Sequence, residues 1–240
     1  MTDRYADTEP LIPSWAAPVY LVASLIAASV FLVFDLFIVS MPGLAILKAL
    51  GIVLLAAYAL FSKAPALALA LGLSACGDFA LGTTPQQTEA GIAFFAGAHL
   101  VYLAMFAIAL ARHGVRKDGL VLALALAAYG AAMWLWLSPG MGYLLPTASA
   151  YLGLILIMAA VAALVNGPRL ITIGALLFVL SDSILAAGWF RGFELRLGAA
   201  DLQGGLVWTT YYAAQACLAV GIVRLKGQHT GAPPEEEQGL

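Results

Sequence analysis

Eight apolar stretches follow one another along the chain, separated by short polar turns, and each is long enough to cross a bilayer. A membrane-spanning helix needs roughly 17–25 such residues. The pattern predicts spans at residues 14–37, 43–62, 64–82, 91–111, 119–138, 143–165, 170–190 and 204–225. These spans make up a transmembrane domain at 14–225, preceded by an N-terminal segment at 1–13. The tail at 226–240 is polar, acidic and contains two prolines, a composition typical of disorder.

Composition supports a membrane protein. Of the 240 residues, 63% are hydrophobic and only 10% are charged, which no ordinary soluble domain combines. We therefore predict an all-α bundle of eight transmembrane helices. The formal net charge of −2 gives no reason to expect a nucleic-acid partner. Cys76 and Cys217 both fall inside apolar runs, where a cysteine is more often a small buried hydrophobe than half of a disulfide.

The basic residues predict how the bundle is oriented, because Lys and Arg gather in cytoplasmic loops. With eight spans, both termini share one side of the membrane. Eight cations fall on that side: Arg4, Lys63, Arg112, Arg116, Lys117, Arg169, Arg224 and Lys226. Only Arg191 and Arg196 fall on the other side, and Lys48 lies within a span. Both termini are therefore expected to be cytoplasmic, in the cytoplasmic membrane of a bacterium.

Polar side chains inside the spans share one depth. At 1.5 Å of rise per residue, they lie within roughly 6–16 Å of the non-cytoplasmic boundary. The set consists of Lys48, Asp78, His99, Tyr102, Asp182 with its neighbour Ser181, Tyr211, Tyr212 and Gln215. Such a shared level predicts the lining of a single pocket that opens toward the outer leaflet.

Some of these residues also have a purely structural explanation. Lys48 could extend its amine to the interface, and His99 could be a hydrogen-bonded core residue. Tyr211 and Tyr212 could be packing or interfacial aromatics. The two aspartates are different, since a carboxylate at that depth costs about 2.5–3.5 kcal/mol on insertion scales and is usually functional.

The candidate chemistry is that of acids and bases. The chain contains no nucleophile elbow, zinc-binding H-E-x-x-H, phosphate-binding loop or dinucleotide fingerprint. Only His99 among the three histidines lies in a span, so we predict neither a metal nor another cofactor. Two carboxylates and a lysine remain, with neutral hydrogen-bonding groups around them. This set suits general acid/base catalysis or the binding of a proton or ion.

Four stretches carry a resemblance to a known family: SACGDFALG around Asp78, FFAGAHLVYLAMF around His99, FVLSDSILA around Asp182 and YYAAQACL around Gln215. With these motifs the chain resembles the YhhN-like family of eight-span membrane proteins, the lysoplasmalogenases. Lys48 matches the family's lysine in the second span, although Ala49 stands where a proline is usual. The resemblance covers about residues 21–225 and leaves out the tail.

The resemblance implies hydrolysis of the vinyl ether bond of lysoplasmalogens, alkenyl lysophospholipids with an ethanolamine or choline headgroup. The products would be a fatty aldehyde and a glycerophospho-alcohol. The residues suit this chemistry, because a protonated carboxyl group can deliver a proton to the alkenyl carbon and an ionised one can activate water. Asp78 and Asp182 are the candidate catalytic residues, and the sequence does not assign the acid to either. Lys48, His99, Tyr102, Ser181, Tyr211 and Gln215 are candidate supporting residues.

Two other functions use the same residues. One is a proton- or ion-coupled transporter of small molecules or lipids, and the other is a lipid-binding protein in which the aspartates are paired structurally. Separately, GDFALG and SDSILA occur on spans that run in the same direction, which hints at a four-plus-four internal duplication.

Overall fold

The structure is a computed structural model and describes residues 16–37 and 43–227. The predicted segment at 1–13 and the tail beyond residue 227 lie outside the described residues. Within the described ranges the chain forms eight long helices, each apolar enough to cross a membrane. They are α1 (Ala16–Phe37), α2 (Leu44–Phe61), α3 (Pro65–Gly82), α4 (Thr88–His113), α5 (Gly119–Leu137), α6 (Leu145–Leu164), α7 (Arg169–Arg191) and α8 (Leu202–Gly227).

The predicted spans are confirmed to within a few residues at either end. The helices end where the chain carries a proline, or a glycine that adopts a positive φ. Pro65 begins α3 at a position where its missing N–H costs nothing, and Gly192 ends α7 in the left-handed conformation with φ of 64°. Short 3₁₀ turns at Ser138–Gly140 and Gly142–Leu144 join α5 to α6. A two-stranded hairpin, β1 (Arg196–Leu197) and β2 (Ala200–Asp201), joins α7 to α8.

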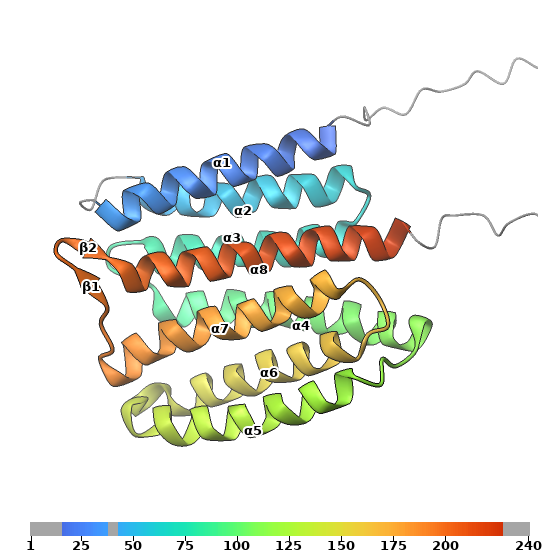
Figure 1. Cartoon of the computed structure of the whole chain (residues 1–240). Coiled ribbons are helices and arrows are strands. Elements are labelled where there is room, and N and C mark those ends of the chain that lie inside the picture. The colour runs from blue at the N-terminus through green and yellow to red at the C-terminus, as the bar shows by residue number, and fades with distance from the viewer. Residues whose placement is uncertain (1–15, 38–42, 228–240) are drawn as a thin grey trace, which may run out of the picture.

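Seven of the helices pack into a closed ring. Neighbours follow the order α1, α2, α3, α4, α6, α7, α8, and α8 packs back against α1. Helix α5 lies outside this ring against α6 and α7, at the lower edge of Figure 1. The ring therefore brings residues from α2, α3, α4, α6, α7 and α8 toward one interior.

The outside of the bundle is apolar. Large hydrophobic side chains are exposed on all eight helices, among them Val33, Leu60, Leu124 and Ile173. In water such a surface would be unfavourable, whereas in a bilayer it contacts acyl chains. Together with the length of the helices, this surface identifies a multi-pass integral membrane protein.

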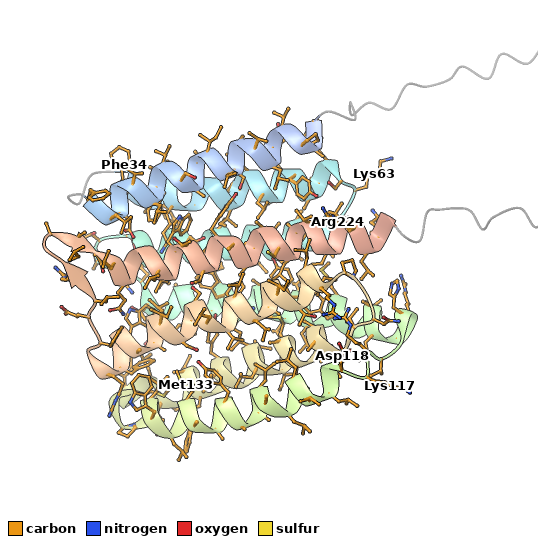
Figure 2. The ribbon with its side chains drawn as sticks, in the orientation of Figure 1. Phe34, Lys63, Lys117, Asp118, Met133 and Arg224 are labelled. Atoms are coloured by element: carbon orange, nitrogen blue, oxygen red, sulfur yellow. The ribbon has the colours of Figure 1, made fainter. Side chains whose placement is uncertain are left out.

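The two ends of the bundle differ in charge. Lys63, Lys117 and Arg224 lie at the end where α1 begins and α8 ends (Figure 2). The α7–α8 hairpin lies at the opposite end (Figure 1). Three of the basic side chains that predicted an orientation therefore lie at the same end of the bundle.

Helices α7 and α8 approach closely at Gly174. A Cβ atom there would lie 2.8 Å from the carbonyl oxygen of Ala214 and 2.9 Å from the backbone nitrogen of Leu218. We predict that Gly174→Ala lowers the free energy of unfolding by about 1–3 kcal/mol, the usual cost of overpacking. Thermal unfolding in detergent measures this. Gly153→Ala on α6 is the matched control, because no atom lies within 4 Å of its added methyl group. Equal stability of both variants would contradict the close approach.

Candidate functional site

A cavity of about 510 Å³ occupies the interior of the bundle. It reaches the hairpin end, since Glu194 and Arg196 contribute to its wall. Its wall is mainly apolar, and the polar side chains on it include Lys48, Asp78, Tyr151, Asp182 and Tyr211. Both aspartates that the sequence singled out therefore face one shared space.

Asp78 on α3 is nearly fully buried, with 2% of its side chain exposed. Each of its two carboxylate oxygens has a different neighbour. The Tyr211 hydroxyl on α8 donates a hydrogen bond to Oδ2 at 2.7 Å, and the Lys48 amine on α2 lies 3.9 Å from Oδ1. A hydroxyl donor and a cation together favour the ionised form of this carboxylate.

A chain of hydrogen bonds from two other side chains reaches the Tyr211 hydroxyl. The Gln215 side-chain amide donates to the Tyr211 hydroxyl at 3.3 Å, and Tyr102 donates to the amide oxygen of Gln215 at 2.7 Å. Tyr102 and Gln215 are fully buried and lie outside the cavity wall. Their contact with the site passes through Tyr211, which they fix in place between α4 and α8.

Asp182 on α7 has a different set of neighbours. The Tyr151 hydroxyl on α6 donates to its Oδ2 at 2.5 Å, and His99 Nε2 on α4 lies 3.0 Å from the same hydroxyl. Because Tyr151 uses its only hydrogen toward Asp182, the histidine must donate, which places its hydrogen on Nε2. His99 Nδ1 is then an acceptor, and it is buried without a hydrogen-bond partner among the described residues.

An aromatic cluster lies between the two groups of hydrogen-bonded residues. The Phe178 ring on α7 packs edge-on against His99, with centroids 4.5 Å apart, and against Tyr211 at 5.4 Å. Phe95 contacts Phe178 and Tyr211 in the same edge-on manner. Through these ring contacts Phe95 and Phe178 connect the two groups of hydrogen-bonded residues.

Of the predicted site residues, Lys48, Asp78, Ser181, Asp182 and Tyr211 line the cavity. The Ser181 hydroxyl donates to the backbone carbonyl of Val207 at 2.9 Å, so its hydrogen bond joins α7 to α8. His99, Tyr102 and Gln215 lie one layer behind the wall.

Tyr212 points elsewhere and exchanges a hydrogen bond of 2.9 Å with Ser24 on α1. Tyr212 therefore contacts α1, whereas Tyr211 contacts Asp78.

Sequence reasoning missed Tyr151. It stands in an apolar run with no charged neighbour, and an isolated membrane tyrosine attracts no attention. The depth argument would have found it. Tyr151 lies six residues into α6 from the hairpin end, or about 9 Å, which is the level of the other polar residues. The described residues contain no group of three His, Cys, Asp or Glu side chains placed to hold a metal ion.

These features define a class: an integral membrane protein of eight helices with two carboxylates facing one intramembrane cavity. The model of the YhhN family matches residues 44–222, which is most of the chain and includes the site. The chain belongs to the YhhN family.

Two relatives carry the name lysoplasmalogenase TMEM86B. The protein of Rattus norvegicus is 38% identical over 163 residues, which is 67% of this chain and 63% of the relative. That of Sus scrofa is 35% identical over 153 residues, which is 64% of this chain and 61% of the relative. The matched region thus spans less than two thirds of either relative. No solved structure matches the chain.

The Tyr102–Gln215–Tyr211 chain predicts a coupled loss of stability. In Gln215→Leu two buried hydroxyl groups lose a partner, so the free energy of unfolding should fall by about 1–3 kcal/mol. In a Tyr102→Phe background the same change should cost clearly less, because one of the two hydroxyls is already gone. Thermal unfolding of the single and double variants measures this coupling. Strictly additive losses would show that the three residues do not act as a chain.

Proposed function

We propose that this protein is a lysoplasmalogenase-like hydrolase that cleaves the vinyl ether bond of alkenyl lysophospholipids. Two aspartates facing one cavity, each with a tyrosine hydroxyl as donor, are the observation that carries the proposal. Membership of the YhhN family and the name of the two relatives support it. The products are a fatty aldehyde and a glycerophospho-alcohol.

The proposed chemistry needs one acid and one base. Protonation of the alkenyl β-carbon gives an oxocarbenium ion, and water then adds to the α-carbon with loss of a proton to the second carboxylate. The hemiacetal then collapses. Its hydroxyl proton passes to the first carboxylate, and the second carboxyl group gives its proton to the departing glycerol oxygen. Water is consumed, both carboxyl groups recover their starting state, and no redox partner is required. The logic resembles that of glycoside hydrolysis by paired carboxylic acids.

The cavity has the character that such a substrate requires. Its polar mouth, with Asp35, Arg196 and Asp201, suits a glycerophospho headgroup, and its apolar inner wall suits the alkenyl chain. The reacting bond lies where headgroup and chain meet, so it would sit near the aspartates below the mouth. A lysolipid has one long chain, and the available volume of about 510 Å³ fits part of that chain together with the glycerol.

We also propose that both termini are cytoplasmic, so that the cavity opens toward the outer leaflet. The gathering of Lys63, Lys117 and Arg224 at one end supports this orientation. We expect a reporter fused after Gly227 to be found on the cytoplasmic side of the membrane. We expect a reporter inserted in the hairpin at Gly198 to be found on the other side. If the two reporters were found on the opposite sides, the cavity mouth would lie in the cytoplasmic leaflet.

The main test is the release of aldehyde from an alkenyl lysophospholipid. We predict that Asp78→Asn and Asp182→Asn each lower kcat by about 10²- to 10⁴-fold, the usual contribution of a general acid or base. Glu89→Gln is the control, since Glu89 is exposed and lies outside the main cavity. In D₂O the aldehyde should carry one deuterium on the carbon next to the carbonyl.

Two results would contradict the proposed function. Release of fatty acid from the acyl lysolipid would indicate an esterase, in which the acids have other roles. Asp182-dependent proton flux in proteoliposomes without aldehyde release would indicate the transporter instead. The matched alkyl lysolipid, which has no double bond to protonate, should remain intact in every sample.

A further inference from the structure

The two Asp–Tyr pairs differ in one respect that bears on their roles. Asp78 accepts a hydrogen bond from the Tyr211 hydroxyl at Oδ2, and its Oδ1 has the Lys48 amine 3.9 Å away as an ion-pair partner. Asp182 has Tyr151 on Oδ2, and the described residues give its Oδ1 no hydrogen-bond partner and no cation. One carboxyl group therefore has a cation beside its second oxygen and the other has none among the described residues, although both line the cavity.

Electrostatics assigns the proton from this difference. Two carboxyl groups that face one mainly apolar cavity disfavour each other's negative charge. A single negative charge is most stable on Asp78, where Lys48 lies 3.9 Å away and Tyr211 donates. Asp182 has only Tyr151 and lies in apolar surroundings, where a second charge is unfavourable. The remaining proton therefore belongs on Asp182, and its Oδ1 is the atom that can carry it.

His99 and Tyr151 give this proton a fixed direction. Tyr151 donates to Oδ2, so a proton on the carboxyl group is restricted to Oδ1. His99 holds the Tyr151 hydroxyl from the other side at 3.0 Å. The histidine is fully buried and packs against Phe178 at 4.5 Å, so its ring is held in place. Among the described residues Nδ1 has no hydrogen-bond partner, so the Nε2 bond to Tyr151 is the one side-chain hydrogen bond of His99 there.

We propose that Asp182 is the proton donor to the alkenyl carbon, that Tyr151 and His99 are positioning residues that aim its Oδ1 proton into the cavity, and that Asp78, beside Lys48, is the charged carboxylate that activates water. This inference rests on the proposed function and adds to it. In the first step the Oδ1–H bond breaks, a C–H bond forms on the β-carbon, and the electrons of the double bond supply that new bond.

Chemical rescue separates the two roles. Asp182→Ala and Asp78→Ala each leave space for a small carboxylic acid, and acetic acid with acetate is the probe. Aldehyde release by Asp182→Ala should rise with the concentration of protonated acetic acid, and that by Asp78→Ala with the concentration of acetate. Varying the pH at constant total acetate changes the two forms in opposite directions. The Asp78→Ala, Asp182→Ala double variant measures acid-catalysed background hydrolysis.

Each result of the rescue experiment decides the assignment. Rescue of Asp182→Ala by acetate, or its failure to respond to protonated acid, overturns the assignment. A wild-type protein that releases no aldehyde would instead refute the proposed function itself, so the two failures are distinguishable.

The positioning role is tested by separating kcat from KM. Tyr151→Phe should lower kcat by about 10- to 100-fold, as expected for a misplaced catalytic group, and leave KM within about twofold. His99→Gln keeps an N–H donor and should retain more of kcat than His99→Leu, which has none. Equal kcat in these two variants, or a Tyr151→Phe effect confined to KM, would show that the residues only shape the cavity.

Discussion

A carboxyl group inside an apolar bundle needs hydrogen-bond donors that the surrounding helices must supply, and this requirement organises the interior. Every donor used here is a side chain, because the backbone N–H groups of the helices are already engaged. Asp78 and Asp182 each receive one tyrosine hydroxyl, from α8 and α6 respectively. Each tyrosine is held in turn by an N–H donor, from Gln215 or His99. Four side chains, two tyrosines with Gln215 and His99, thus hold the two carboxyl groups.

The sequence revealed the helices and the level of the site well, for a simple physical reason. Bilayer thickness fixes how long an apolar run must be, so α1 to α8 appear almost directly in the hydropathy pattern. Depth also follows from helical rise, which placed Asp78 and Asp182 together. Lateral order does not follow. Nothing in the local pattern says that α5 lies outside the ring and that α4 packs on α6. Tyr151 was missed, and the sequence could not separate the supporting residues on the cavity wall from His99 and Gln215 behind it, because that distinction depends on lateral order.

The ring also explains why two similar motifs can have different chemistry. The stretches around Asp78 and Asp182 are alike, but the tyrosine partners come from α8 and α6, which are not equivalent positions in a four-plus-four repeat. The duplication stays a prediction. What distinguishes the two carboxyl groups is a neighbour on another helix, Lys48 on α2, which Asp182 lacks among the described residues. A short sequence motif carries no information about such a neighbour.

The Phe178 ring touches residues of both groups, His99 on one side and Tyr211 on the other. A change in its volume would affect Tyr211 directly and Tyr151 through His99. Substitutions near the two carboxyl groups should therefore show epistasis even where they are far apart in the chain. In the proposed reaction, a substitution at position 178 would therefore alter the surroundings of both carboxyl groups together and would be unsuitable for changing one of them alone.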